Sequence, residues 1–192
     1  MTALAELLVR IAGRVGEHES PIATELARTL RGVAEHPLRL PPTEVPLCRR
    51  LPALAEPSAE PLVADVLACK GRLHWRSRGA GKRPAALAAR IASVEIVGPT
   101  GMIACDTLRF GLFLQDSLLD YPSHWHAAEE LYLVLHGKAR WTAGHGMPRL
   151  VPPGRFVHHL PWQPHRMTSG ADPLLALWCW CGEIDYATYE LL

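Results

Sequence analysis

The first third of the chain carries apolar residues at three- and four-residue spacing, the pattern of amphipathic helices. One helix is predicted over residues 3–15, with its apolar stripe at Leu4, Leu7, Leu8, Ile11 and Val15. A second is predicted after Ser20, a good N-cap, with Pro21 in the first helical position and an apolar face at Ile22, Leu26, Leu30 and Val33. A third is predicted over residues 60–69. The segment between the second and third, residues 37–61, holds seven of the seventeen prolines and predicts an extended connector.

From Ser93 onward the pattern changes to short alternating segments separated by turn residues. One predicted strand alternates at Leu108, Phe110, Leu112 and Leu114, and later strands are predicted over residues 138–143, 149–151, 156–159, 165–168 and 174–180. Eight or so short strands at this spacing are typical of a closed β-barrel or a two-sheet jelly roll. We therefore expect a mainly β protein, with a helical segment over residues 1–90 and a barrel over residues 91–192.

Composition excludes several kinds of partner. The chain has 192 residues, with 20 Lys and Arg against 19 Asp and Glu, so nothing calls for nucleic acid or an anionic membrane. The paired N-terminal helices lack the clustered basic face of a DNA-binding helix-turn-helix, and we expect them to pack on the barrel or on a second subunit. The basic residues of one run are expected to form a solvated face, with an anion-attracting rim of a pocket as the alternative; they are Arg72, Arg76, Arg78, Lys82 and Arg83.

The five cysteines are scattered and form no CxxC pair, which fits free thiols in a reducing compartment. The first fifteen residues carry Glu6, Arg10 and Arg14 within their apolar pattern, unlike a signal peptide, and no stretch reaches the roughly 18 apolar residues of a membrane span. We expect a soluble cytoplasmic protein. A homodimer is compatible with such a fold, but no sequence feature establishes one.

The stretch from Tyr121 to Gly137, YPSHWHAAEELYLVLHG, contains the candidate chemistry. On a strand His124 and His126 share one face, and Glu130 and Tyr132 do likewise after a turn through two alanines. Imidazole and carboxylate groups that converge on one point suit one divalent transition metal such as Zn, Fe, Mn, Co or Ni. The alternative is that these histidines are ordinary polar residues on a barrel rim.

The pattern His-x-His-x3-Glu-x6-Gly in this stretch resembles the first signature of the cupin family of small β-barrels. That resemblance implies a single cupin jelly-roll barrel after the helical segment. The second cupin signature usually supplies a histidine shortly after a Pro-x-Gly turn. Here Pro152-Pro153-Gly154 is followed by three candidates, His158, His159 and His165, and the usual position is occupied by Val157, so the general pattern does not decide among them.

A closer resemblance decides among these three histidines. The same stretch, with VGPTG before it and HHLPWQPHRM and LWCWCGE after it, resembles the cupin-type dimethylsulfoniopropionate lyases over roughly residues 60–185. The resemblance implies that His126, Glu130 and His165 are metal ligands, that the position of His124 contributes in some members, that Tyr132 is the catalytic base and that Tyr121 lines the same pocket. The tract GAGKRPAALAAR departs from the aromatic and basic pocket residues that the family often has before its barrel.

The implied reaction is a β-elimination that releases dimethyl sulfide and acrylate from a small-molecule carboxylate substrate. A metal can polarise the carboxylate, while Tyr132 removes the α-proton; a free phenol has a pKa of about 10, which a nearby cation lowers. Aromatic faces attract a sulfonium cation, and Tyr121, Trp162 and Trp180 are candidates for that role. His159 is a candidate to orient the pocket or a ligand.

Two alternatives remain from the sequence. One is a cupin enzyme that acts on another small carboxylate, as an isomerase, a dioxygenase or another lyase, since three histidines and a glutamate around iron also serve oxygen chemistry. The other is a ligand-binding cupin without catalysis. A pure binding protein has no need of a base beside a metal ligand, so the presence of Glu130 and Tyr132 favours the enzyme.

Overall fold

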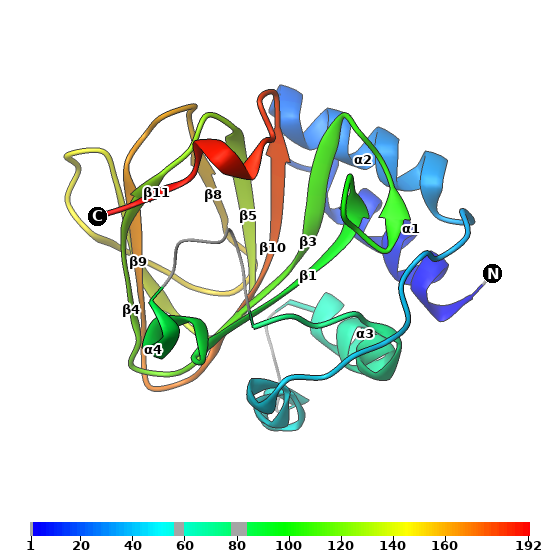
Figure 1. Cartoon of the computed structure of the whole chain (residues 1–192), viewed down its shortest axis with the longest axis horizontal. Coiled ribbons are helices and arrows are strands. Elements are labelled where there is room, and N and C mark those ends of the chain that lie inside the picture. Colours follow the sequence, from blue (N-terminus) through cyan, green and yellow to red (C-terminus); the bar gives the residue numbers. More distant parts are fainter. Residues whose placement is uncertain (1, 56–59, 78–83) are drawn as a thin grey trace.

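The computed structural model describes residues 2–55, 60–77 and 84–192 (Figure 1). The helices are α1 (Ala3–Val15), α2 (Pro21–Val33), α3 (Leu62–Cys69) and α4 (Ala85–Ala88), with 3-10 helices η1 (Pro46–Ala55), η2 (Lys70–Arg72) and η3 (Tyr186–Thr188). The three predicted helices are therefore confirmed. The Ser20 hydroxyl accepts a hydrogen bond from Ala23 N–H at the start of α2, as its cap position predicts.

The prediction of an extended connector over residues 37–61 is wrong for η1. Pro46 and Pro52 have the φ value that a 3-10 turn needs, so they do not prevent it. The helix buries Leu51 and Leu54, each 1% exposed, in the core beneath the sheet. Burial of these two leucines favours a helical turn over an extended chain.

The strands form two sheets. The larger has the order β2-β1-β3-β10-β5-β8 and the smaller the order β11-β4-β9-β6-β7. Their bounds are β1 (Ile91–Gly98), β2 (Ile103–Ala104), β3 (Leu108–Gln115), β4 (Asp120–Trp125), β5 (Glu129–His136), β6 (Ala139–Ala143), β7 (Arg149–Val151), β8 (Phe156–His159), β9 (His165–Ser169), β10 (Leu174–Cys181) and β11 (Glu190–Leu191). The expected mainly β jelly roll after a helical segment is confirmed, as two facing sheets rather than one continuously paired barrel.

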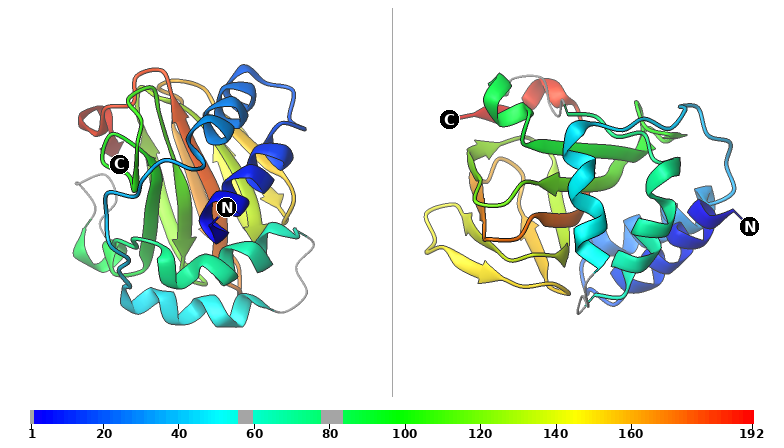
Figure 2. Two further views of the ribbon diagram at one scale, coloured as in Figure 1. Left: turned by 90° about the vertical axis from the view of Figure 1, so that its right-hand side faces the viewer. Right: turned by 90° about the horizontal axis from the view of Figure 1, so that it is seen from below.

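The larger sheet is buried on both faces. Helices α1, α2 and α3 lie together on one side of it, and the smaller sheet lies on the other (Figure 1 and Figure 2). The alternating leucines of β3, such as Leu112, face the helices with Leu133 of β5 and Leu177 of β10. The residues between them, such as Phe113, face the smaller sheet. The predicted alternation is therefore correct, but its apolar side looks toward the helical layer and not into the space between the sheets.

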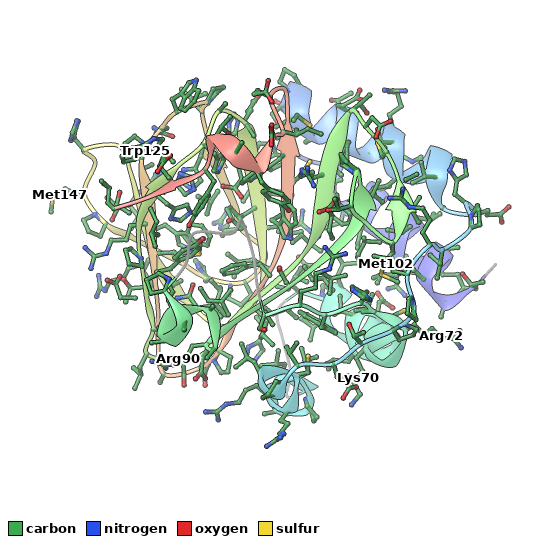
Figure 3. The ribbon with its side chains drawn as sticks, viewed as in Figure 1. Lys70, Arg72, Arg90, Met102, Trp125 and Met147 are labelled. Carbon is green, nitrogen blue, oxygen red and sulfur yellow. The ribbon has the colours of Figure 1, made fainter. Side chains whose placement is uncertain are left out.

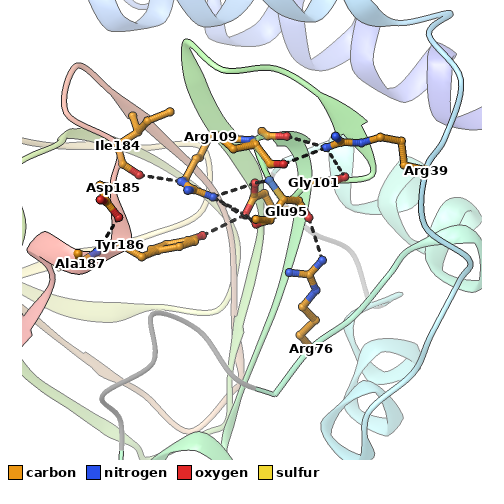
Figure 4. Close-up of polar contacts among 12 residues, drawn as sticks. Arg39, Arg76, Glu95, Gly101, Arg109, Ile184, Asp185, Tyr186 and Ala187 are labelled. Atoms are coloured by element: carbon orange, nitrogen blue, oxygen red, sulfur yellow. Dashed lines mark hydrogen bonds and ion pairs between the residues drawn. The ribbon is translucent and has the colours of Figure 1, made fainter.

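A buried ion pair anchors the segment after β10 (Figure 4). Arg109 donates from Nη1 to both carboxylate oxygens of Glu95 at 3.0 Å and from Nε to the Ile184 carbonyl at 2.7 Å. The Tyr186 hydroxyl donates to Glu95 at 3.2 Å, and its ring lies under the Arg109 guanidinium at 4.0 Å. These contacts hold η3 against the end of the larger sheet. They thereby place Tyr186 of η3 and Tyr189, which follows it, beside the space between the sheets.

The basic run lies partly outside the described residues, because Arg78, Lys82 and Arg83 fall there. Arg72 lies beside Lys70 next to α3, on the helical side of the molecule (Figure 3). Arg76 donates to the Thr100 carbonyl at 2.9 Å. Within the described ranges no helix has both the length and the apolar character to cross a membrane. The division of the chain at residue 90 stays a prediction.

Candidate metal centre and pocket

Three predicted ligands meet in the space between the sheets. One ligand atom from each of His126, Glu130 and His165 lies within 4.8 Å of the other two, and all three side chains are buried. His126 follows β4, Glu130 lies on β5 and His165 begins β9, so three separate strand ends supply the group. Oε2 of Glu130 lies 3.0 Å from Nε2 of His126 and 3.1 Å from Nε2 of His165.

Backbone carbonyls fix the orientation of these imidazoles. Nδ1 of His126 lies 3.0 Å from the Ala128 carbonyl, and Nδ1 of His165 lies 2.8 Å from the Gln163 carbonyl. A carbonyl only accepts, so each Nδ1 must carry the proton. If both imidazoles are neutral, each Nε2 lone pair points at the Glu130 carboxylate oxygen, so two hydrogen-bond acceptors face each other without a proton between them. This arrangement needs positive charge at its centre, either as protons or as a cation.

The donor set fits a divalent metal. Two imidazole nitrogens and a carboxylate oxygen are ligand types of zinc and its first-row neighbours, and Nδ1–H bonds to carbonyls are the usual way in which ligating histidines are oriented. Burial alone would raise the pKa of the Glu130 carboxyl, but His126 and His165 outweigh that effect and hold its pKa well below the usual range. Glu130 is thus an anion in the folded protein, as a metal ligand must be.

Trp180 holds the other oxygen of this carboxylate. Its Nε1 donates to Oε1 of Glu130 at 2.7 Å, and its ring lies 4.0 Å from the His126 ring, centroid to centroid. Trp180 is on β10, directly opposite Glu130 in the β5–β10 pairing, so sheet register brings the two together. Glu130 therefore contacts the two histidines through Oε2 and the indole through Oε1.

His124 lies beside the group but is not one of the three. Its ring is stacked on Tyr121 at 4.2 Å and meets the His165 ring edge-on at 4.1 Å. Its Nδ1 lies 2.9 Å from the Pro122 carbonyl, so it too directs Nε2 away from the backbone. Tyr121 in turn has its hydroxyl 2.6 Å from that of Tyr189.

An aromatic pocket opens above the His and Glu side chains. It includes the predicted Tyr121, His124, His126, Glu130, Tyr132 and Trp180, and its volume is about 40 Å³. Tyr132 is 4% exposed and lies on the same face of β5 as Glu130. Four further aromatic wall residues were not predicted from the sequence: Phe113, Trp178, Tyr186 and Tyr189. The clustering of two tyrosines in YATY at 186–189 is the only sequence signal that points to the last two.

Two of the predicted residues, Trp162 and His159, are not among those that line this pocket. Trp162 is 55% exposed in the loop before β9, with a φ of 61°, and does not line the pocket; its backbone N–H donates to the His126 carbonyl at 2.8 Å. His159 is fully buried on β8 opposite Glu130, with its ring stacked 4.1 Å from that of His165. Burial, and then the charge of His165, lowers the pKa of His159 to about 3, so its imidazole is neutral. The third histidine candidate, His158, faces outward and bonds to Glu129 at 2.7 Å.

A family model for dimethylsulfoniopropionate lyases matches residues 18–176. The chain is 31% identical to dimethylsulfoniopropionate lyase DddQ of Ruegeria pomeroyi over 153 residues, which are 79% of this chain and 75% of that protein. It is 35% identical to the putative dimethylsulfoniopropionate lyase DddL of Cereibacter sphaeroides over 114 residues, 58% of this chain. The match covers 47% of that second relative, so the chain spans about half of its length.

Solved structures share the fold over almost the whole chain. A chain from the crystal structures of DMSP lyases RdDddP and RnDddQII superposes with a TM-score of 0.75 at 25% identity, covering 99% of this chain and 98% of that one. The crystal structure of DMSP lyase DddQ from Ruegeria pomeroyi DSS-3 gives a TM-score of 0.78 at 24% identity over 98% of this chain and 95% of that one. The helical layer is part of the shared fold, since both matches include it.

Proposed function

The chain belongs to the dimethylsulfoniopropionate lyase family, a family of carbon–sulfur lyases, and on that basis we propose that it cleaves dimethylsulfoniopropionate into dimethyl sulfide and acrylate. One observation carries the proposal beyond family membership. Tyr132 and Glu130 project from the same face of β5 into one buried pocket, with the imidazoles of His126 and His165 beside the carboxylate. A base and an anchoring point for a carboxylate therefore lie next to each other.

In the proposed reaction Tyr132, as phenolate, accepts the proton from the α-carbon of the substrate. The C–H electron pair becomes the double bond between the α- and β-carbons, and the bond from the β-carbon to sulfur breaks with its electrons on sulfur. The products are acrylate, neutral dimethyl sulfide and the phenol of Tyr132. A general base in this position contributes roughly 10²- to 10⁴-fold to the rate.

The metal ligands in this proposal are His126, Glu130 and His165. His124, whose ring contacts that of His165, is a candidate fourth ligand. A divalent transition metal held there would act as a Lewis acid toward the substrate carboxylate and stabilise the developing carbanion by several kcal/mol. The residues themselves supply the frame. The Nδ1–H bonds to backbone carbonyls fix both imidazoles, and Trp180 fixes the carboxylate.

The aromatic walls suit the sulfonium end of the substrate. We expect the rings of Tyr121 and Trp180 to attract the sulfonium cation, and four further aromatic rings line the same pocket: Phe113, Trp178, Tyr186 and Tyr189. Each ring face attracts a cation by about 0.5–2 kcal/mol when water is excluded. The described cavity holds about 40 Å³, room for only a few water molecules, so substrate binding requires wall side chains to move outward.

The test is headspace gas chromatography of dimethyl sulfide from purified, metal-reconstituted protein incubated with dimethylsulfoniopropionate. Tyr132→Phe is expected to lose roughly 10²-fold or more in kcat, since the base is removed and the ring retained. His165→Ala is expected to lose both metal and activity, whereas the outward-facing His158→Ala serves as its matched control and retains both.

Two results would contradict the proposal in different ways. No dimethyl sulfide from folded, metal-loaded protein would mean that the substrate is another small carboxylate. Full activity in Tyr132→Phe would keep the substrate but assign the proton transfer to a different group, and incubation in deuterated water would then show whether the α-proton still exchanges.

A further inference from the structure

A second cleft opens between the free edges of the two sheets, where β7 and β8 face each other. Its floor and walls include Trp141, Val151, Val157 and His159, and its volume is about 580 Å³. Among the residues described as lining the two sites, it shares none with the aromatic pocket. His159 of the cleft stacks on the ligand His165 with 4.1 Å between ring centroids, so the cleft lies next to the metal ligands.

Sheet register places one arginine on the inner wall of this cleft. Arg149 of β7 pairs directly with Trp141 of β6, and directly opposed residues of an antiparallel pair project from the same face. Arg149 is therefore on the inner face of the smaller sheet, at its open edge. Among the described residues it has no acidic partner, and no acidic side chain lines the cleft.

Two buried polar side chains line the same cleft without hydrogen bonds to described residues. Trp141 is 3% exposed and its Nε1–H has no acceptor; His159 is 0% exposed and neither ring nitrogen has a partner. The nearby Gln163 side chain contributes to the pKa of His159, but no hydrogen bond of good geometry joins the two side chains. An indole can only donate and an imidazole must donate from one nitrogen, so both lack an acceptor. Buried donors without acceptors are rare in folded proteins.

The chemistry of the cleft defines its ligand. An arginine fork, an indole N–H and an imidazole N–H all call for oxygen acceptors with negative charge, and the valines offer a small apolar wall. We propose that this cleft is a second binding site, for a small aliphatic monocarboxylate held by Arg149, Trp141 and His159. The site goes beyond the proposed elimination and does not depend on it.

The turn between β7 and β8 is fixed, so the cleft is preformed. Gly154 N–H donates to the Val134 carbonyl at 2.8 Å, and Arg14 of α1 donates to the Gly154 carbonyl at 2.8 Å. The cleft edge is thus tied to β5 from within and to the helical layer from outside. A preformed site binds a ligand without the cost of ordering its own backbone.

The experiment follows two indole N–H resonances in zinc-loaded, ¹⁵N-labelled protein during titration with sodium propionate. Trp141 reports on the cleft, and Trp180, which donates to Glu130, reports on the metal pocket; Trp141→Phe and Trp180→Phe assign the two signals. Sodium chloride at the same ionic strength controls for salt. Arg149→Ala tests the cation, and Arg140→Ala, an exposed arginine on the outer face of the same strand pair, is the matched control.

The Trp141 resonance is expected to move with propionate in a saturable manner and not with chloride. Arg149→Ala is expected to raise the apparent Kd by about tenfold or more, because a charge-assisted bond is lost, and Arg140→Ala to change it by less than about twofold. A Trp141 signal that does not move would overturn the proposal. So would a signal that moves equally in Arg149→Ala, or one that only follows Trp180, which would place propionate in the metal pocket alone.

Discussion

Substitution of Trp180 by phenylalanine isolates one hydrogen bond to the candidate metal centre. The change keeps an aromatic ring near His126 but removes the Nε1–H that donates to Oε1 of Glu130 at 2.7 Å. A hydrogen bond to a charged group contributes about 1.5–3 kcal/mol. At 1.4 kcal/mol for each factor of ten, its loss corresponds to an increase of about 10- to 100-fold in the metal Kd. Partners that orient ligands in this way typically have effects of about that size.

The same strand offers a close control. Trp178 lies two residues earlier on β10, lines the same pocket and also donates from Nε1, but to the Leu112 backbone carbonyl at 3.2 Å. Trp178→Phe therefore removes the same chemical group from a neutral acceptor that no metal would contact. We expect its metal Kd to stay within about threefold of the wild type, since no charged partner is affected.

The assay is competition for Zn²⁺ against a chromophoric chelator, with circular dichroism to confirm that each variant is folded. Metal binding unchanged in Trp180→Phe would show that the indole does not orient Glu130. An equal loss in both variants would show that indole size, and not the hydrogen bond, matters. Either result would refute the argument from the 2.7 Å bond.

Other parts of the structure give three further predictions. Arg109→Met leaves the buried Glu95 carboxylate without its cation and should lower the free energy of unfolding by about 3–5 kcal/mol in urea denaturation; Glu95→Gln in the same chain should restore part of the loss, and no restoration would deny the coupling. Burial alone would raise the pKa of Asp120, but its hydrogen bonds with Arg166 outweigh burial and lower that pKa. These bonds therefore contribute fully to the free energy of unfolding above about pH 4, and their contribution is lost as pH falls through the lowered pKa. Asp120→Asn should therefore lower the free energy of unfolding by less than about 1 kcal/mol near neutral pH, and the difference from the wild type should disappear in acid. A difference that grows in acid would contradict the lowered pKa of Asp120. Trp162→Ala should leave kcat/KM for dimethylsulfoniopropionate within about twofold, and a loss of about tenfold would restore the substrate contact that the sequence predicts for it.

Local signals in the sequence were sufficient for the regular elements. The bounds of α1 and α2 follow from their apolar stripes and from Ser20 and Pro21, which act on the adjacent backbone. The 3-10 helix η1 could not be predicted in the same way, because its prolines read as breakers and the burial of Leu51 depends on α3 and the sheet. Long-range packing decides such segments, and one sequence does not display it.

The residues of the candidate site also differ in whether local sequence or long-range packing determines their position. His126, Glu130 and His165 were predicted because ligand types at family spacing are visible in sequence, and the structure brings them together. Tyr189 was not predicted, since it reaches the pocket only through β11 pairing with β4 and through the ion pair that holds the segment before it. Trp162 was predicted as a pocket residue, yet the direction of a loop side chain is set by backbone angles that spacing does not reveal.

The two-sided burial of the larger sheet determines how far the chain can be shortened. Leu112, Leu133 and Leu177 would face water if the helical layer were removed, and a contiguous apolar face of that kind promotes aggregation. The same three strands carry Phe113, Tyr132 and Trp178 on the reverse side. A minimal catalytic fragment made of the strands alone would therefore need a redesigned outer surface, although no described residue of α1, α2 or α3 lines the pocket.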